Sequence, residues 1–455
     1  MGLRKNDIIS LEISGMTSEG SGVGRHEGMA VFVAGTAVGE VISCKIIKVA
    51  KKYAIGKIEK IITASPHRIE PDCPVYKSCG GCVFRHISYD EELKIKRQRV
   101  IDAVKRIGGF DKELVGEIIG AKSPDSYRNK AQLPVGLDRE GNYIAGFYAW
   151  RSHRIIDCGE CKLQPEIFSQ VIKIFKLWCE TFKPEPYDET SHRGLLRHLY
   201  LRYGQSSGEL MAALVLNGDK IKGELELAKM LSDEIEGFKS LIVNVNREKT
   251  NVILGKKCRT VWGKDYITDT LCGLKFNISP LSFYQVNHDQ AERLYSIAAD
   301  YAGLCGEEVL LDLYCGTGTI GLTMANRVKK LIGVEVIPQA VENAKENARL
   351  NNINNAEFIC ADAAKAAEKL NADGVKPDVI IVDPPRKGLT PELIETIAQL
   401  NPDRVVYVSC DCATMARDLK LFGEYNYTPK KLTPVDMFPR TGHVETVVLM
   451  SKVEK

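Results

Sequence analysis

Two side chains that could act together in catalysis lie near the C-terminus, a thiol and a carboxylate. Cys410 directly follows the apolar run 405–409 (VVYVS), and Glu445 directly precedes the run 446–449. A cysteine at the end of a buried strand is a candidate nucleophile, although a structural cysteine is the commoner explanation. A carboxylate brought next to it by the fold could accept a proton from the same substrate.

A glycine-rich turn at 309–321 (VLLDLYCGTGTIG) predicts a site for a nucleotide-like cofactor. Gly316 and Gly318 permit a tight turn after a buried strand, and the next helix presents its N-terminal amides. Glu335 ends the next predicted strand, 331–336, where a carboxylate could bind a ribose diol. The glycine spacing differs from GxGxxG, which argues against a dinucleotide.

Asp383 opens a DPPR sequence directly after the apolar run 379–382. Two prolines fix a rigid loop at the carboxyl end of a strand, which is where open α/β sheets bind their ligands. Residues 271–455 are therefore predicted to form an α/β domain of the Rossmann-like, doubly wound type.

One reaction that needs a thiol, a base and such a cofactor together is methylation of a pyrimidine at C5. Carbon 5 of uracil is too weak a nucleophile to attack a sulfonium unaided, but a thiolate added at C6 turns it into an enolate carbon. That carbon can take the methyl group of S-adenosylmethionine, after which a base removes the C5 proton. Cys410 would be the nucleophile and Glu445 the base, acting on one flipped nucleotide.

A second group of cysteines has the spacing of a metal site. Cys73, Cys79 and Cys82 follow a C-x5-C-x2-C pattern, and Cys158 and Cys161 are the nearby candidates for a fourth ligand. Ligation by thiolates alone selects zinc or an iron–sulfur cluster, and the spacing does not separate the two.

The composition limits which kinds of protein this chain can be. The 455 residues carry a formal net charge of only +3, which allows a nucleic-acid partner without requiring one. We expect a cytoplasmic protein without a membrane segment, because no apolar stretch reaches the length of a signal or a transmembrane helix. Fourteen cysteines in such a chain favour metal binding or catalysis over disulfides. We expect a monomer.

The chain divides into three predicted domains. Residues 1–60 alternate short apolar segments with glycine turns, as in an OB-like barrel. Residues 61–270 form an α+β central domain with the cysteine group, and 271–455 form the catalytic domain. A helix predicted over 89–107 could pack on the catalytic domain, and its basic face would be solvated or contact RNA.

Two further stretches have residue types that bind nucleic acid. Lysines gather in the last two barrel strands, where they could face phosphates or only solvent. The stretch 145–156 (AGFYAWRSHRII) interleaves Phe147, Tyr148 and Trp150 with basic residues. Such a mixture can stack bases and bind phosphates, or form an ordinary half-buried hairpin.

Several motifs resemble the RNA uracil-5-methyltransferase family, and within it the bacterial 23S ribosomal RNA (uracil-5-)-methyltransferases. Residues 15–41 (GMTSEGSGVGRHEGMAVFVAGTAVGEV) resemble the TRAM domain, an RNA-binding barrel. The catalytic motifs are FYQVN (283–287), LDLYCGTGTIGL (311–322), DPPRKG (383–388), VYVSCDCATMARDL (406–419) and FPRTGHVET (438–446). The resemblance implies a class I S-adenosylmethionine methyltransferase fold and ribosomal RNA as substrate.

The resemblance also implies roles for individual residues. Cys410 matches the family's nucleophile and Glu445 its base. The positions that match S-adenosylmethionine contacts are Gln285, Tyr314, Glu335 and Asp383. The positions that match ligands of a [4Fe-4S] cluster are Cys73, Cys79, Cys82 and Cys161. The chain departs from the family pattern at Cys412, where proline is frequent, and at Thr319, where asparagine is frequent.

The residues leave three alternative functions open. The same chemistry could act on transfer RNA. The Asp-Pro-Pro loop also suits N-methylation of an amino group, which needs no thiol. A protein of another class, an RNA-binding or iron–sulfur sensor protein on an inactive methyltransferase fold, would have no use for a nucleophile and a base.

Overall fold

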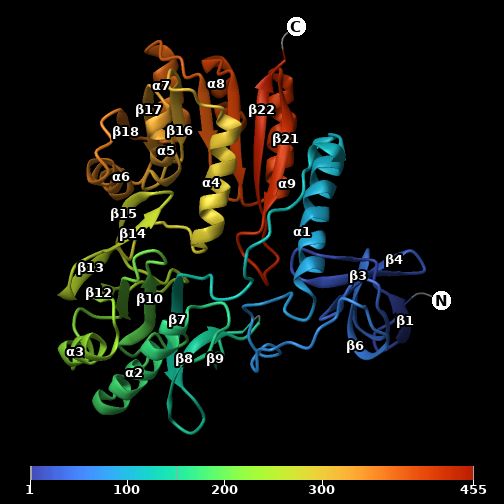
Figure 1. Cartoon of the computed structure of the whole chain (residues 1–455). Helices are drawn as coiled ribbons and strands as arrows, with labels where there is room; N and C mark the ends of the chain where they lie inside the picture. The colour runs from blue at the N-terminus through green and yellow to red at the C-terminus, as the bar shows by residue number, and fades with distance from the viewer. Residues whose placement is uncertain (1–2, 151, 454–455) are drawn as a thin grey trace.

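The computed structural model describes residues 3–150 and 152–453, whose strands form three sheets and one hairpin. Figure 1 shows the three parts: an N-terminal barrel in blue, a central sheet in green and a C-terminal sheet in orange and red. No helix of the described residues is long and apolar enough to cross a membrane.

The N-terminal sheet has the strand order β1-β5-β6-β4-β3-β2. Its strands are β1 (Ile8–Glu12), β2 (Gly15–Met16), β3 (Ser21–His26), β4 (Met29–Ala34), β5 (Val41–Val49) and β6 (Tyr53–Thr63). Alternate residues such as Val31, Val33 and Ile42 point inward to a small core. The sequence predicts that glycines mark the turns of this barrel, yet Gly22 and Gly24 lie within strand β3. Gly24 is needed because a side chain would overlap Leu11 and the Glu12 carbonyl.

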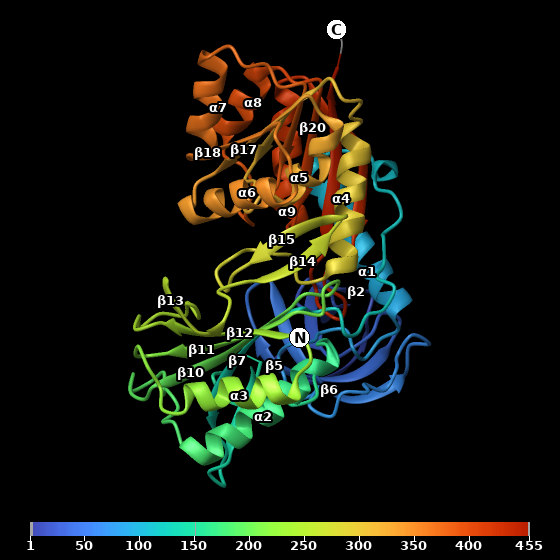
Figure 2. The same ribbon diagram turned by 60° about the vertical axis from the view of Figure 1, so that its left-hand side comes forward.

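The central sheet has the order β13-β12-β11-β10-β7-β8-β9. Its strands are β7 (Lys130–Leu137), β8 (Tyr143–Tyr148), β9 (Ile155–Asp157), β10 (Leu196–Tyr203), β11 (Leu210–Leu216), β12 (Phe238–Val245) and β13 (Lys257–Gly263). Helices α2 (Glu166–Phe182) and α3 (Glu224–Glu234) cover one face (Figure 2). The other face packs on the hairpin β14 (Ile267–Leu271) and β15 (Leu274–Ile278).

The C-terminal sheet has the order β18-β17-β16-β19-β20-β22-β21. Its strands are β16 (Val309–Leu313), β17 (Lys330–Glu335), β18 (Ala356–Cys360), β19 (Val379–Val382), β20 (Arg404–Ser409), β21 (Tyr427–Val435) and β22 (Glu445–Lys452). Strands β16 to β20 pair in parallel, and β22 and β21 add antiparallel neighbours. This is the doubly wound α/β sheet that the catalytic motifs predict.

Helices cover both faces of this sheet, which explains its continuous apolar strands. On one face lie α4 (His288–Ala302), α5 (Thr319–Met324) and α6 (Pro338–Leu350), and 3₁₀ turn η3 (Ala325–Arg327) follows α5. On the other face lie α7 (Ala363–Ala372), α8 (Pro391–Leu400) and α9 (Cys412–Glu424).

Helix α1 (Tyr89–Ala103) belongs to the second layer although it lies far away in sequence, and Figure 1 shows it beside α9. It continues into the π-helical turn η1 (Val104–Gly108), and the 3₁₀ turn η2 (Lys112–Leu114) follows. Part of its predicted basic face is used within the protein. Arg97 donates to the Gly116 carbonyl at 2.9 Å, and Arg99 to that of Gly442 at 2.5 Å.

Candidate active site

The carboxyl edge of the C-terminal sheet opens into a cavity of about 530 Å³. Six residues that the sequence motifs single out line it: Gln285, Tyr314, Glu335, Asp383, Cys410 and Glu445. Cys410 and Glu445 are neighbours because Ser409 pairs with Thr446 in the antiparallel ladder of β20 and β22. The end of one strand and the start of the other therefore lie at the same edge.

The turn after β16 has the conformation that its glycines predict. Gly316 and Gly318 have φ of +57° and +82°, and Tyr314 before them has φ of +69°, which is rare for an aromatic residue. The Gly316 amide donates to the Glu335 carboxylate at 3.2 Å, which ties the turn to the end of β17. Backbone, aromatic ring and carboxylate thus form one wall of the cavity.

Two other acidic residues near this edge do not line the cavity. Asp312 is buried beneath the turn, where it accepts a hydrogen bond from the Gly321 amide at 2.9 Å. Asp362, which follows β18, caps helix α7 by accepting from the amides of Ala364 and Lys365. From the sequence alone, an acidic residue that follows this strand could either contact an adenine amino group or cap the next helix, and the structure has Asp362 as the cap.

The DPPR loop is anchored to helix α9. Asp418, which is fully buried, accepts from the Leu389 amide at 2.8 Å and from the Tyr407 hydroxyl at 2.8 Å. Thr414 donates to the Arg386 carbonyl at 3.1 Å. These contacts hold Asp383 and Arg386 at the cavity wall without using either side chain.

Burial makes negative charge costly in this cavity. It raises the pKa of Asp383 to about 7 and, together with repulsion from Asp383, that of Glu445 to about 8. The pKa of the Cys410 thiol is raised to about 11, first by burial and then by Glu445 and Asp383. Arg386 acts in the opposite direction on both Cys410 and Glu445. The arrangement therefore favours a positively charged ligand.

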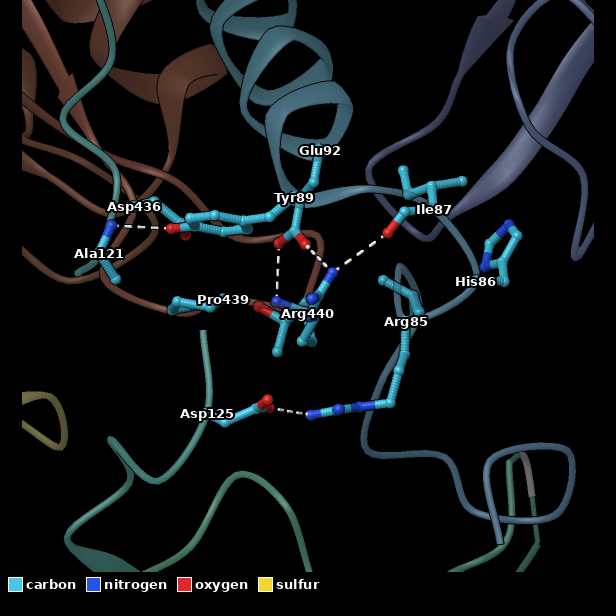
Figure 3. Close-up of polar contacts among 12 residues, drawn as sticks. Arg85, His86, Ile87, Tyr89, Glu92, Ala121, Asp125, Asp436, Pro439 and Arg440 are labelled. Atoms are coloured by element: carbon cyan, nitrogen blue, oxygen red, sulfur yellow. Dashed lines mark hydrogen bonds and ion pairs between the residues drawn. The ribbon is translucent and has the colours of Figure 1, made fainter. Parts of the chain in front are cut away.

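A buried ion cluster holds the segment that leads to Glu445, and Figure 3 shows part of it, with Glu92 directed at Arg440. The Lys96 ammonium, which is only 1% exposed, donates to Glu92 and Asp436 at 2.7 Å each. Glu92 also accepts from the backbone amide of Arg440 at 2.7 Å, and Tyr89 donates to Asp436 at 2.8 Å. The start of α1 thus fixes residues 436–440 against the catalytic sheet.

Other residues of the cavity escape the sequence analysis as site residues. Lys130 reaches it from β7, and Phe438 and His443 reach it from the segment before β22. The pKa of Lys130 is lowered to about 8, by burial and then by Arg202 and Arg128. In the sequence, Lys130 is only a polar residue at the start of an apolar strand. Its place in the cavity depends on how the central domain packs against the catalytic domain, which the sequence does not reveal.

Five cysteines line a separate cavity of about 200 Å³: Cys73, Cys79, Cys82, Cys158 and Cys161. Arg85, Arg128 and Lys162 line it as well. A hydrogen bond from Cys158 lowers the pKa of Cys79 to about 6. Within residues 3–150 and 152–453, however, no group of three or more His, Cys, Asp or Glu side chains is arranged to hold a metal ion. The predicted cluster is therefore not supported by the arrangement of the ligands themselves.

Comparison with known families gives matches over nearly the whole chain. The family profile described as tRNA (uracil-5-)-methyltransferase matches residues 89–453, and that of the TRAM domain matches residues 4–58.

Similar whole proteins include bacterial relatives and one solved structure. A Clostridium tetani protein named as an uncharacterized RNA methyltransferase is 47% identical over 449 residues, covering 99% of this chain and 97% of its own. A relative with the same designation in Halalkalibacterium halodurans is 45% identical over 448 residues, with 98% of each chain covered. The crystal structure of the Pyrococcus abyssi tRNA (uracil-54, C5)-methyltransferase with S-adenosyl-L-homocysteine has a TM-score of 0.78 at 28% identity, covering 97% of this chain and 100% of its own.

The raised pKa of Glu445 gives a testable pH dependence of stability. A glutamate in the unfolded chain has a pKa of about 4.3, so the native state binds this proton more tightly and the contribution of Glu445 to stability falls as pH rises from about 4 to about 8. Glu445→Gln should therefore match the wild type near pH 4 and exceed it by on the order of 5 kcal/mol above about pH 8, because each unit between the two pKa values is worth about 1.4 kcal/mol.

The measurement is the melting temperature at both pH values. The exposed variant Glu234→Gln on α3 serves as the control and should change it at neither pH. A Glu445→Gln variant less stable than the wild type at the higher pH would contradict the assignment.

Proposed function

The chain belongs to the tRNA (uracil-5-)-methyltransferase family and carries a TRAM domain, as its motifs predict, and from this premise we propose that it methylates C5 of a uridine in 23S ribosomal RNA. The family makes it an S-adenosylmethionine-dependent RNA methyltransferase. The observation that supports methylation at C5 is the shared cavity of Cys410, Glu445, Asp383 and Glu335, at the edge where such sheets bind their ligands.

S-adenosylmethionine would bind beside the glycine turn. Glu335, already oriented by the Gly316 amide, would accept hydrogen bonds from the ribose hydroxyls. Tyr314 and Gln285 would contact the remainder of the cofactor, and Asp383 would face its positive end. The raised pKa values of Asp383 and Glu445 fit this assignment, because a cationic ligand relieves the cost of their charge. When bound, the cofactor supplies an electrophilic methyl group.

Cys410 and Glu445 would carry the two protein steps of the reaction. The Cys410 thiolate bonds to C6 of the flipped uracil, and the electron pair of the C5–C6 double bond moves into an enolate that ends on O4. The enolate carbon C5 forms a bond to the methyl group while the bond between that methyl group and the sulfonium sulfur breaks, which would leave S-adenosylhomocysteine as the second product. Glu445 then accepts the C5 proton, the double bond re-forms, and the Cys410–C6 bond breaks to release the thiolate.

The second thiol in the SCDC sequence does not compete for this role. Cys412 is 3% exposed, and its sulfur lies 3.9 Å from the Arg99 carbonyl oxygen, between α9 and α1. Cys410 lines the cavity and Cys412 does not. This difference supports Cys410 as the nucleophile.

Transfer RNA is the second candidate substrate. The similarity over the full length of the Pyrococcus abyssi tRNA (uracil-54, C5)-methyltransferase favours it. The likeness of the motifs to bacterial 23S ribosomal RNA enzymes favours the first candidate.

Mapping of 5-methyluridine in cells with and without the gene separates the two substrates. We expect one or more 23S ribosomal RNA positions to lose the methyl group when the gene is deleted, and transfer RNA to keep it. Loss from transfer RNA alone would establish the second candidate, and no loss from either RNA would refute both.

The covalent step predicts trapping on modified RNA. Ribosomal RNA containing 5-fluorouridine has no C5 proton to lose, so it should stay bonded to the wild type in the presence of S-adenosylmethionine. The bond should survive denaturing electrophoresis. Cys410→Ser should abolish the trapped complex, and the matched variant Cys412→Ser should keep it. Equal trapping by Cys410→Ser and the wild type would contradict the mechanism.

We also retain a [4Fe-4S] cluster in the second cavity as a proposal. The thiols are not arranged to hold a metal ion, but they line one cavity together with three basic side chains, which suit the negative charge of a thiolate-bound cluster. Cys73, Cys79, Cys82 and Cys161 would be the ligands. Uracil methylation by this route transfers no electrons, so the cluster would have a structural role.

Anaerobic purification followed by iron and sulfide analysis tests this proposal. If Cys161 is the fourth ligand, Cys161→Ala should lose both elements and Cys158→Ala should keep them. Zinc without sulfide in the wild type would refute the cluster. Loss of iron and sulfide in Cys158→Ala but not in Cys161→Ala would make Cys158 the fourth ligand in place of Cys161.

A further inference from the structure

The loop that joins β21 to β22 contributes two rings to the catalytic cavity. This hairpin loop spans residues 436–444, and the strands on either side of it pair at Val435 and Glu445. Phe438 in its first half and His443 in its second half both line the cavity. Their rings meet edge-on, with centroids 6.0 Å apart and an interplanar angle of 77°. The shape of the hairpin loop therefore decides where the cavity wall beside Glu445 lies.

Four successive backbone carbonyls of the hairpin loop accept hydrogen bonds from other parts of the chain. The pairs are Met437 with the Asn287 side chain at 3.1 Å, Phe438 with Lys96 at 3.1 Å, Pro439 with the Tyr127 hydroxyl at 3.0 Å, and Arg440 with the amides of Val83 and Phe84 at 2.8 and 3.2 Å. Val83 directly follows Cys82, which lines the cysteine cavity. Arg440 is thus the residue at which the hairpin loop meets the segment between the cysteine cavity and α1.

The backbone of Arg440 has a conformation that an arginine adopts at a cost. Its φ is +66°, in the left-handed region that favours glycine. The residue is 7% exposed, and its amide donates to the Glu92 carboxylate at 2.7 Å. A strained conformation of this kind persists only where the surroundings fix it, and here hydrogen bonds to both the amide and the carbonyl do so.

The guanidinium of Arg440 binds the same segment as its backbone. Figure 3 shows it between Glu92 and the carbonyl of Ile87. Its Nη1 atom donates to that carbonyl at 3.2 Å and lies 3.5 Å from Oε2 of Glu92, while the group faces the Tyr89 ring at 5.6 Å. Oε2 of this fully buried carboxylate has no hydrogen-bond partner among the described residues, so the ion pair with Arg440 compensates its burial.

We propose that Arg440 is a positioning residue for the reaction: it holds the hairpin loop in the shape that places the two rings and Glu445 around a flipped uracil. The inference rests on the proposed function for its substrate. The glycine turn and Glu335, which form the wall proposed for the cofactor, belong to the ends of β16 and β17 and not to this loop. Loss of the Arg440 side chain therefore slows the steps on the base and leaves cofactor binding unchanged.

Arg440→Gly tests this separation of the two effects. Glycine adopts a positive φ freely, so the variant loses the guanidinium while the backbone turn is kept. The rate of covalent trapping on 5-fluorouridine ribosomal RNA, at saturating RNA and S-adenosylmethionine, should fall about tenfold, because small misplacements of reacting groups are costly. The dissociation constant for S-adenosylhomocysteine, measured by calorimetry, should stay within twofold of the wild type. The control variant Arg139→Gly, at an exposed position between β7 and β8, should match the wild type in both measurements.

Arg440→Lys provides the rescue. It returns a positive charge to Glu92, so it should be trapped faster than Arg440→Gly and more slowly than the wild type. Three results would each overturn the proposal: trapping of Arg440→Gly within twofold of the wild-type rate, a parallel loss of S-adenosylhomocysteine binding, or a lysine variant no faster than the glycine variant. If Arg440→Gly does not fold, the comparison of Arg440→Lys with the wild type decides, and trapping at the wild-type rate would overturn the proposal.

Hydrogen exchange of the backbone amides tests the hold on the hairpin loop without any reaction. Peptides that cover residues 436–444 should exchange faster in Arg440→Gly than in the wild type, and peptides of β16 and β17 should exchange at the same rate in both. Unchanged exchange in the hairpin loop would overturn the proposal. A wild type that is never trapped on 5-fluorouridine RNA would refute the proposed function, whereas faster exchange in the loop of the variant would still support its positioning by Arg440.

Discussion

The cost of burying negative charge at one sheet edge is the constraint on which the site depends. Asp383, Glu445 and Cys410 meet there because the parallel strands β19 and β20 end at the edge where the antiparallel strand β22 begins. Burial raises the pKa of all three groups. A cation relieves this cost, and the cavity wall offers Arg386 and Lys130 as well as room for a positively charged cofactor. The burial that makes negative charge costly in this cavity thus favours a cationic ligand.

The rest of the molecule keeps these groups in place. Helix α1 contributes Lys96 and Glu92 to the buried cluster that fixes the segment leading to Glu445. The barrel loop contacts the same segment at Gly442, and the central domain contributes Lys130 to the cavity. Three parts of the chain therefore meet around one short segment, the one that leads to Glu445.

The sequence predicts the catalytic sheet well because apolar runs and glycine turns mark its strands and loops within short stretches of the chain. The apolar run before Gly316 becomes β16, and the glycines adopt the positive φ that their turn requires. Membership of the family is confirmed by the comparisons. What sequence does not reveal depends on docking between distant parts: Lys130 reaches the cavity across a domain boundary, and Ser18 lies against Gly442. Asp362 is a case where two uses of one residue, ligand contact and helix cap, look identical in sequence.

The roles of the individual site residues, and the ligands of the cysteine cavity, stay predictions. Release of tritium from ribosomal RNA labelled at C5 of uridine tests the central claim most directly, because the proposed base removes that proton after methyl transfer. With S-adenosylmethionine, the wild type should release one tritium for each methyl group transferred, and Cys410→Ser should release none. Methyl transfer without release of tritium would show that carbon 5 is not the acceptor and would contradict the account.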